Sequence, residues 1–351
     1  MTLKVGLSAS PYTQSGVDLI VEADRLGVDS VWVPEAWGYD ALTPLAYLAA
    51  RTTRVRLGTG IVQLGARSPA MLAMSAMSLQ ALSGGRLLLG MGASGPQVME
   101  GWHGVRFTKP VQRTRETIEI VRMIARGERV AYDGEAYKLP LPGGEGRTIR
   151  SSAGPAHVPI YIAALGPANL ALTGELADGW IGNSFLPESA AVFFDPIRRG
   201  AEAAGRSIGD LDLTVSARLE FTDDVEEAAR RHAGGYAFTF GAMGTAEHNF
   251  YNDAFSRQGF GDDVREVQRL WLEGDRQGAQ NRVPSEIGLK TNLLGSRDMV
   301  TERLRLYRDA GVTTLRVGLT GDLDNQLESA EALLSLADAV NGEGRPPAQK
   351  P

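Results

Sequence analysis

Short apolar runs alternate with amphipathic stretches along most of the chain. Each run has the length of a buried strand, and the stretch after it spaces its apolar residues as one face of a helix does. Ser15–Gly27 shows the helical signals: Ser15 is the expected N-cap, and Gly27 stands at the C-terminal end. Pro69 marks the start of a helix that runs to Leu82. The runs predicted as strands are Leu3–Ala9, Asp29–Pro34, Val55–Gly60, Arg86–Met91, Pro159–Ala164, Gly179–Gly182, Leu211–Leu219 and Thr313–Gly318.

This alternation predicts a parallel sheet whose strands are joined by crossover helices. Eight strand–helix units favour closure into an α/β fold of the (β/α)8 TIM-barrel type, and a doubly wound open sheet is the alternative. The remaining barrel helices are predicted at 41–51, from Gly166-Pro167 onward, and at 188–204, 296–310 and 323–340.

Two segments interrupt the alternation, and we expect both to be insertions on the barrel. Residues 96–158 contain a predicted helix at 111–126, a possible hairpin around Asp133-Gly134, and a Gly/Pro/Ser-rich piece. Residues 240–295 belong to a mostly helical stretch. We therefore predict a single barrel domain over residues 1–341, followed by a polar, disordered tail at 342–351.

Composition narrows the possible functions. The 351 residues carry a net charge of −6 without a Lys/Arg-rich run, which argues against nucleic acid or an anionic membrane as a partner. The absence of cysteine excludes disulfides, thiolate catalysis and zinc–cysteine sites, and the 4 histidines are not paired at metal-ligand spacing. No segment resembles a signal peptide or reaches the ~20 apolar residues of a membrane span. We expect a cytoplasmic protein without a metal site.

Candidate chemistry lies where the predicted strands end, because barrel enzymes place their active sites there. Glu35 and Trp37 follow the second strand, and His103 closes the glycine-rich loop after the fourth. Each has a structural alternative: a carboxylate that binds helix-start amides for Glu35, packing over the barrel mouth for Trp37, and a surface histidine for His103. Gly166–Ala168 opens a helix, where free amides stabilise a phosphate, or is only a tight turn. Such an apolar, amide-rich mouth suits a planar cofactor that brings its own chemistry.

Four motifs carry a resemblance that covers nearly the whole barrel. They are GVDSVWVPEAWGYDALT at 27–43, RLGTGIVQLGARSPAMLAMSAMSLQALSGGRLLLGMG at 56–92, GASGPQVMEGWHG at 92–104 and PIYIAALGPANLALTGELADGWIGN at 159–183. With these motifs the chain resembles the bacterial luciferase-like superfamily, in the branch that uses the deazaflavin coenzyme F420.

The resemblance implies a coenzyme site built from backbone and small residues. A non-prolyl cis peptide, here Gly60–Ile61, forms a bulge behind the coenzyme ring in that family. Glu35 falls where relatives place an acidic residue near the ring. The loop after the fourth strand lies beside the ribityl chain and ring, and the loop after the fifth binds the phosphate. The matching residues are Gly92, Ala93 and Ser94 for the first loop, and Ala164, Leu165, Gly166, Pro167 and Ala168 for the second.

Two departures from the family pattern bear on the reaction. Sugar-phosphate dehydrogenases of this branch use a histidine and a glutamate as acid/base residues, and Ala36 and Gly95 occupy those places here. The departures argue against that activity and leave Glu35, Trp37 and His103 as catalytic candidates, with His103 or Glu35 as proton donor.

The expected function is an F420-dependent oxidoreductase that transfers a hydride between the deazaflavin and a small organic substrate: an enone, an imine, or a ketone/alcohol pair. One alternative is an FMN-dependent luciferase-like monooxygenase served by a separate reductase. Another is a non-catalytic coenzyme-binding homologue. The resemblance also implies a homodimer.

Overall fold

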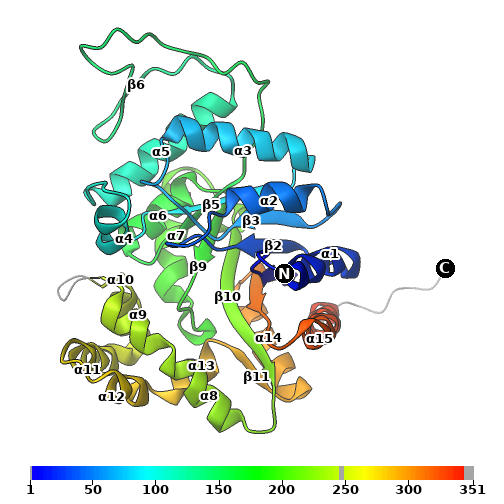
Figure 1. Cartoon of the computed structure of the whole chain (residues 1–351). Helices are drawn as coiled ribbons and strands as arrows, with labels where there is room; N and C mark the ends of the chain where they lie inside the picture. Colours follow the sequence, from blue (N-terminus) through cyan, green and yellow to red (C-terminus); the bar gives the residue numbers. More distant parts are fainter. Residues whose placement is uncertain (1, 245–248, 344–351) are drawn as a thin grey trace.

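Eight parallel strands close into a barrel in this computed structural model, which describes residues 2–244 and 249–343. β1 and β12 pair with Lys4 opposite Thr314, and this pairing joins the two ends of the sheet. The TIM-barrel prediction is therefore confirmed (Figure 1). The barrel strands, in spatial order, are β1 (Lys4–Ser8), β2 (Ser30–Val33), β3 (Arg56–Thr59), β5 (Leu87–Gly92), β8 (Ile160–Ala163), β9 (Gly179–Gly182), β10 (Asp212–Phe221) and β12 (Thr314–Gly318).

Helices follow the strands and cover the outside of the barrel (Figure 1). α5 lies between β5 and β8 in the sequence and packs against α3 and α6, so it is a regular barrel helix. The expectation that all of residues 96–158 form an insertion was therefore too broad. The outer helices are α1 (Gln14–Leu26), α2 (Leu42–Ala49), α3 (Pro69–Ser83), α5 (Pro110–Ala125), α6 (Pro167–Leu176), α7 (Ala191–Ala203), α14 (Arg297–Ala310) and α15 (Leu323–Gly342).

Local capping explains where these helices begin and end. The side chain of Thr13, and not the expected Ser15, accepts a hydrogen bond from the Gly16 amide and starts α1. Gly27 ends α1 in the left-handed conformation that favours glycine, with φ 92°. None of the described helices is long and apolar enough to span a membrane. From residue 344 onward, the predicted disordered tail lies outside the described residues.

The genuine additions to the barrel follow β5 and β10. After β5 come α4 (Pro96–Gly101) and the predicted hairpin, formed by β6 (Tyr132–Asp133) and β7 (Lys138–Leu139). After β10 comes a helical unit with its own apolar core, which lies to one side of the barrel (Figure 1). Its helices are α8 (Val225–Gly234), α9 (Tyr236–Ala242), α10 (Phe250–Phe255), α11 (Gly261–Leu272), α12 (Arg276–Arg282) and α13 (Ser285–Lys290).

Short elements complete the chain. β4 (Val62–Gln63) pairs with the end of β5, and β11 (Leu293–Gly295) pairs with the far end of β10. β11 was not predicted from the sequence, because its three residues are too few to show a periodic pattern. Short helical turns occur at Pro187–Ser189, Ile208–Asp210 and Ser256–Phe260.

A small group of bulky side chains, separate from the larger core under the helices, belongs to the barrel strands: Trp32, Leu88, Tyr161 and Ile181 are all buried. Gly58 allows this packing, because a Cβ there would lie 2.3 Å from the Trp32 ring. The Trp32 indole in turn lies beneath a polar layer that forms the floor of the functional site.

Glu116 fastens the added hairpin to α5. Its fully buried carboxylate accepts hydrogen bonds from the backbone amides of Glu135, Ala136 and Tyr137 at 2.7, 2.9 and 2.8 Å. Burial alone would raise the pKa of Glu116, but the hydrogen bonds from these amides and from Gln112 outweigh it and hold the pKa below its ordinary value. The ionised carboxylate therefore stabilises the fold.

Replacing Glu116 by glutamine should lower the free energy of unfolding by about 2 kcal/mol, because an amide NH2 would face backbone donors. Since the folded pKa is depressed, the advantage of the wild type is present above about pH 4.5 and is lost as the pH falls below it. Urea unfolding at neutral and acidic pH measures both effects. Glu331→Gln, on the exposed face of α15, is the control and should change little. An equal loss at both pH values would contradict the role of the ionised carboxylate.

Candidate active site

A cavity of about 830 Å³ opens at the carboxyl ends of β1, β2, β9, β10 and β12. Its walls combine hydroxyl groups, amides and aromatic rings, the last contributed by Trp37 and by residues of the helical unit. Among the aromatic residues of that unit, Phe240 and Phe255 are fully buried in its core. Phe238 and Tyr251 line the cavity, whereas Phe250 is partly exposed and does not.

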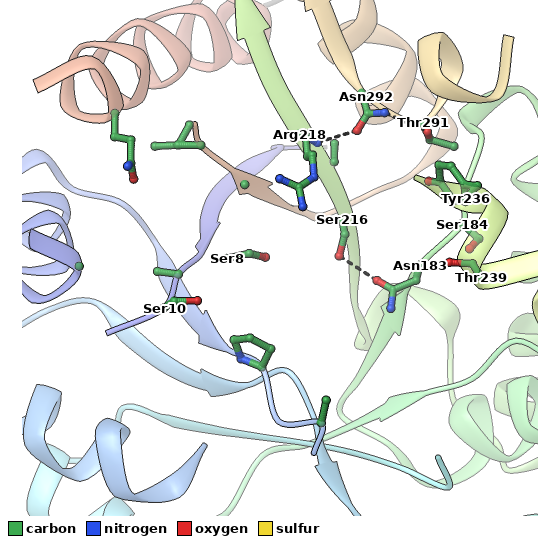
Figure 2. A pocket seen from close by; sticks show the side chains of 18 of the residues that line it. Ser8, Ser10, Asn183, Ser184, Ser216, Arg218, Tyr236, Thr239, Thr291 and Asn292 are labelled. Atoms are coloured by element: carbon green, nitrogen blue, oxygen red, sulfur yellow. Dashed lines mark hydrogen bonds between the residues drawn. The ribbon is translucent and has the colours of Figure 1, made fainter. Parts of the chain in front are cut away.

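Arg218 is the only charged side chain among the described residues that line this cavity (Figure 2). Its backbone amide is held by Asn292 Oδ1 at 2.9 Å, and its side chain stands among the lining residues. Neighbouring Tyr236 stays a neutral phenol, because burial raises its pKa. The described walls thus offer neutral hydrogen-bonding groups and a single positive charge.

Three side chains from neighbouring strands form the floor of the barrel mouth. Ser216 Oγ donates to Asn183 Oδ1 at 2.9 Å, as Figure 2 shows, and Arg316 Nη2 donates to both Ser216 Oγ and Asn183 Oδ1. The Arg316 guanidinium lies over the Trp32 ring, 5.3 Å from its centroid, and burial lowers its pKa to about 10. Arg316 is not among the residues predicted from the sequence, although an arginine inside the apolar run at 313–318 was a usable signal.

The peptide bond between Gly60 and Ile61 is cis, as the resemblance implied. It lies between β3 and β4, where the Gly60 amide donates to Val33 O at 2.8 Å. Gly92, at the end of β5, lies against this point, since a Cβ there would come within 2.5 Å of Ile61 Cδ1. A Cβ on Gly60 would in turn lie 3.1 Å from Arg316 Nη1. The structure thus brings Gly60, Ile61 and Gly92 together beside the floor.

Glu35 is committed to structural contacts. Its carboxylate forms a bidentate ion pair with Arg67 at 2.7 and 2.8 Å and accepts a hydrogen bond from the Ala41 amide at 3.0 Å. The hydrogen bond and charge of Glu35 raise the pKa of Arg67. Glu35 therefore adopts the role that the sequence analysis gave as its alternative, binding an amide just before α2.

His103 is linked to Ala36 through Gln63, and Trp37 follows Ala36 in the chain. His103 Nε2 is 2.6 Å from Gln63 Oε1, and Gln63 Nε2 donates to Ala36 O at 2.7 Å. Because Gln63 donates through its nitrogen, its oxygen accepts from His103 Nε2. Trp37 is half-exposed and lines the cavity. Of the three catalytic candidates, the structure brings only Trp37 to the described cavity wall.

The loop after β8 presents a helix start without a cap. α6 begins at Pro167, Gly166 provides no capping side chain, and no acidic residue stands in the first turn. Its first amides are therefore free for an anion. Arg257 stands behind this loop and donates to Leu165 O at 2.5 Å, which adds positive charge.

The predicted cofactor residues lie outside the described cavity lining. Gly92, Ala93 and Ser94 lie at the end of β5, and Ala164–Ala168 follows β8, whereas the cavity lies over β1, β2, β9, β10 and β12. Apart from Glu35, the predicted cofactor residues therefore lie at or after the ends of strands β3, β5 and β8, which stand between β2 and β9 in the barrel. In the described part of the chain, no cluster of three His, Asp or Glu side chains could hold a metal ion.

Comparison with known proteins gives consistent matches over most of the chain. A family model described as luciferase-like monooxygenase matches residues 2–314. A protein of Mycobacterium tuberculosis (strain ATCC 25618 / H37Rv) with the provisional name coenzyme F420-dependent oxidoreductase Rv3520c is 39% identical over 324 residues, covering 90% of this chain and 93% of the relative. A 5,10-methylenetetrahydromethanopterin reductase of Archaeoglobus fulgidus is 30% identical, covering 84% and 86%. The solved coenzyme F420-dependent tetrahydromethanopterin reductase of Methanopyrus kandleri has a TM-score of 0.78 at 23% identity, covering 95% and 97%.

Proposed function

The chain belongs to the luciferase-like monooxygenase family, and within that family we propose that it is an oxidoreductase dependent on coenzyme F420. The observation that carries this proposal is the 39% identity, over nine-tenths of the chain, to a relative named for F420. The structure supports it by joining a backbone-lined half-site to a separate cavity for a second, small molecule.

The residues present fit such a coenzyme. Glycines at positions 60 and 92 leave the backbone open where a Cβ would intrude, and the uncapped start of α6 offers amides to a phosphate. Gly60 and Ile61 would hold the ring from behind, Gly92–Ser94 would lie along its side, and Ala164–Ala168 would hold the phosphate. When bound, the coenzyme supplies or accepts the hydride at its ring carbon.

The described cavity would hold a small organic substrate, an enone, an imine or a ketone/alcohol pair, beside that ring. Its hydroxyl and amide groups can hydrogen-bond a carbonyl or imine, and Trp37 gives it an apolar wall. We assign Glu35 a positioning role, because Arg67 occupies its carboxylate. His103, which contacts Gln63 and lies outside the described cavity lining, remains the candidate that moves a proton.

Titrating the purified protein with F420 and, separately, with FMN tests the cofactor assignment. We expect saturable fluorescence changes with F420 and much weaker binding of FMN, without oxygen consumption, because a deazaflavin lacks the ring nitrogen that makes reduced flavin react with oxygen. Tight binding of FMN alone would overturn the proposal in favour of a monooxygenase. Binding of F420 without turnover of any enone, imine or ketone would favour the non-catalytic alternative.

We also propose that the protein is a cytoplasmic homodimer. Apolar side chains on neighbouring helices support the dimer: Met71, Met74 and Leu82 of α3 and Tyr47 of α2 are between 48% and 68% exposed. Monomeric proteins rarely leave large apolar side chains together in water, so a second copy is a suitable cover. Sedimentation velocity measures the oligomeric state directly, and a monomer would refute the dimer.

A further inference from the structure

Arg316 is a buried cation that has no assigned role in the proposed coenzyme and substrate sites. It stands in the middle of β12 with only 4% of its surface exposed, and its guanidinium lies over the ring of Trp32 from β2. Burying a guanidinium costs free energy unless an anion or a full set of hydrogen-bond acceptors compensates it. Such a group at the floor of the mouth therefore requires an explanation.

The compensation is incomplete. From the elements packed against Arg316, the groups that meet its guanidinium are Trp32 of β2, Gly60 after β3, Asn183 after β9 and Ser216 of β10. None of these groups carries a charge or titrates. Arg316 forms no ion pair with any described residue; the nearest charged member of the cavity lining is Arg218, one inward-facing position further along β10.

The part of the Arg316 guanidinium that lacks hydrogen-bond partners points to one side. Nη2 is used by Ser216 and Asn183, whereas Nε is buried without a partner and Nη1 makes no hydrogen bond within the described residues. Nη1 is the atom beside Gly60, 3.1 Å from where a Cβ of that glycine would stand. The free edge of a buried cation therefore faces the bulge between β3 and β4.

We infer that Arg316 is the counter-charge of the coenzyme ring, stabilising its anionic form through the Nη1 edge beside Gly60. This inference rests on the proposed function. The hydroxylated deazaflavin ring is an extended acid: when its hydroxyl proton leaves to solvent, the negative charge spreads to the carbonyl oxygens of the pyrimidine. A cation beside the ring favours that form and tunes the electronics of the coenzyme.

The test measures the ring proton and the affinity, not turnover. F420 bound to the wild type, to Arg316→Met and to Arg316→Lys is titrated with acid while its visible absorption reports deprotonation of the ring, and fluorescence gives each Kd. We expect Arg316→Met to raise the pKa of the bound ring by about one unit and to weaken binding at neutral pH about tenfold. Arg316→Lys, which keeps the charge, should recover most of both effects.

Thermal unfolding separates this role from a structural one. Because Arg316→Met removes an unpaired buried charge at similar volume, its unfolding temperature should stay equal or rise. Arg86 is the matched control, since its guanidinium donates to Ala49 O, Thr52 O and Val55 O and is satisfied by the fold. Arg86→Met should therefore lower the unfolding temperature and leave the pKa of the bound ring unchanged.

The outcomes distinguish the two proposals. An Arg316→Met variant with the Kd and ring pKa of the wild type would overturn this inference while F420 dependence stands. So would an Arg316→Lys variant no better than Arg316→Met, because the charge would then not matter. If the wild type itself bound no F420, the proposed function and this inference would fall together.

Discussion

Replacing Ala168 by aspartate should weaken F420 binding about ten- to a hundredfold without destabilising the protein. Ala168 is exposed in the first turn of α6, where the proposed phosphate site has free amides and no acidic residue. A carboxylate there would repel the phosphate at short range, which amounts to roughly 1–3 kcal/mol at the effective dielectric of a protein surface. The same carboxylate favours the helix, because it lies at the positive end of the helix dipole.

The test is specific because the two effects of the aspartate are opposed: F420 binding should weaken, while the unfolding temperature should stay equal or rise slightly. Fluorescence titration gives Kd, and thermal unfolding gives stability. Ala191→Asp is the matched control, because Ala191 is likewise an exposed alanine in the first turn of a barrel helix, α7. It should leave Kd unchanged. If both aspartates left Kd at the wild-type value, the phosphate would be bound elsewhere.

The barrel could be predicted from the sequence because its units are local. Each strand and helix is encoded within about twenty consecutive residues by apolar periodicity and by cap residues such as Ser68 and Gly84 at the ends of α3. Closure of the sheet into a barrel is then favoured by the number of strand–helix units, which is eight. The cis bond at Gly60–Ile61 had no such local signal, and only the resemblance indicated it.

The site was harder to predict because its contacts are distant in sequence. Arg316 meets Asn183 across 133 positions, and Arg67 reaches Glu35 across 32. No periodicity specifies which side chains on different barrel units will meet, so Glu35 could be a catalytic acid or an amide-binding residue until its partner was known. The cavity itself is completed by Phe238 and Tyr251 from the helical unit, whose placement no local pattern encodes.

Replacing Arg67 by methionine should lower the free energy of unfolding by about 2–3 kcal/mol and weaken F420 binding as well. Glu35 and Arg67 are largely buried, with side-chain exposures of 7% and 19%, so the variant leaves a carboxylate without its counter-charge. Removing one partner of a buried pair costs several kcal/mol, and the remaining exposure of Arg67 reduces that figure. F420 binding should weaken because Glu35 Oε1 also accepts a hydrogen bond from the backbone amide of Gln63 at 3.4 Å. Gln63 lies three residues after Gly60, which belongs to the proposed ring site.

The double variant Glu35→Gln/Arg67→Met distinguishes the pair from its individual side chains. Glutamine can still accept from the Ala41 amide and carries no charge to leave unpaired, so the double variant should be more stable than Arg67→Met alone. Arg230→Met is the control: Arg230 pairs with Glu226 and Glu227 on the solvent-exposed face of α8, and its loss should not measurably change urea unfolding. If Arg67→Met were as harmless as Arg230→Met, the Glu35 carboxylate would not depend on Arg67, and its assignment as a positioning residue rather than a proton donor would have to be withdrawn.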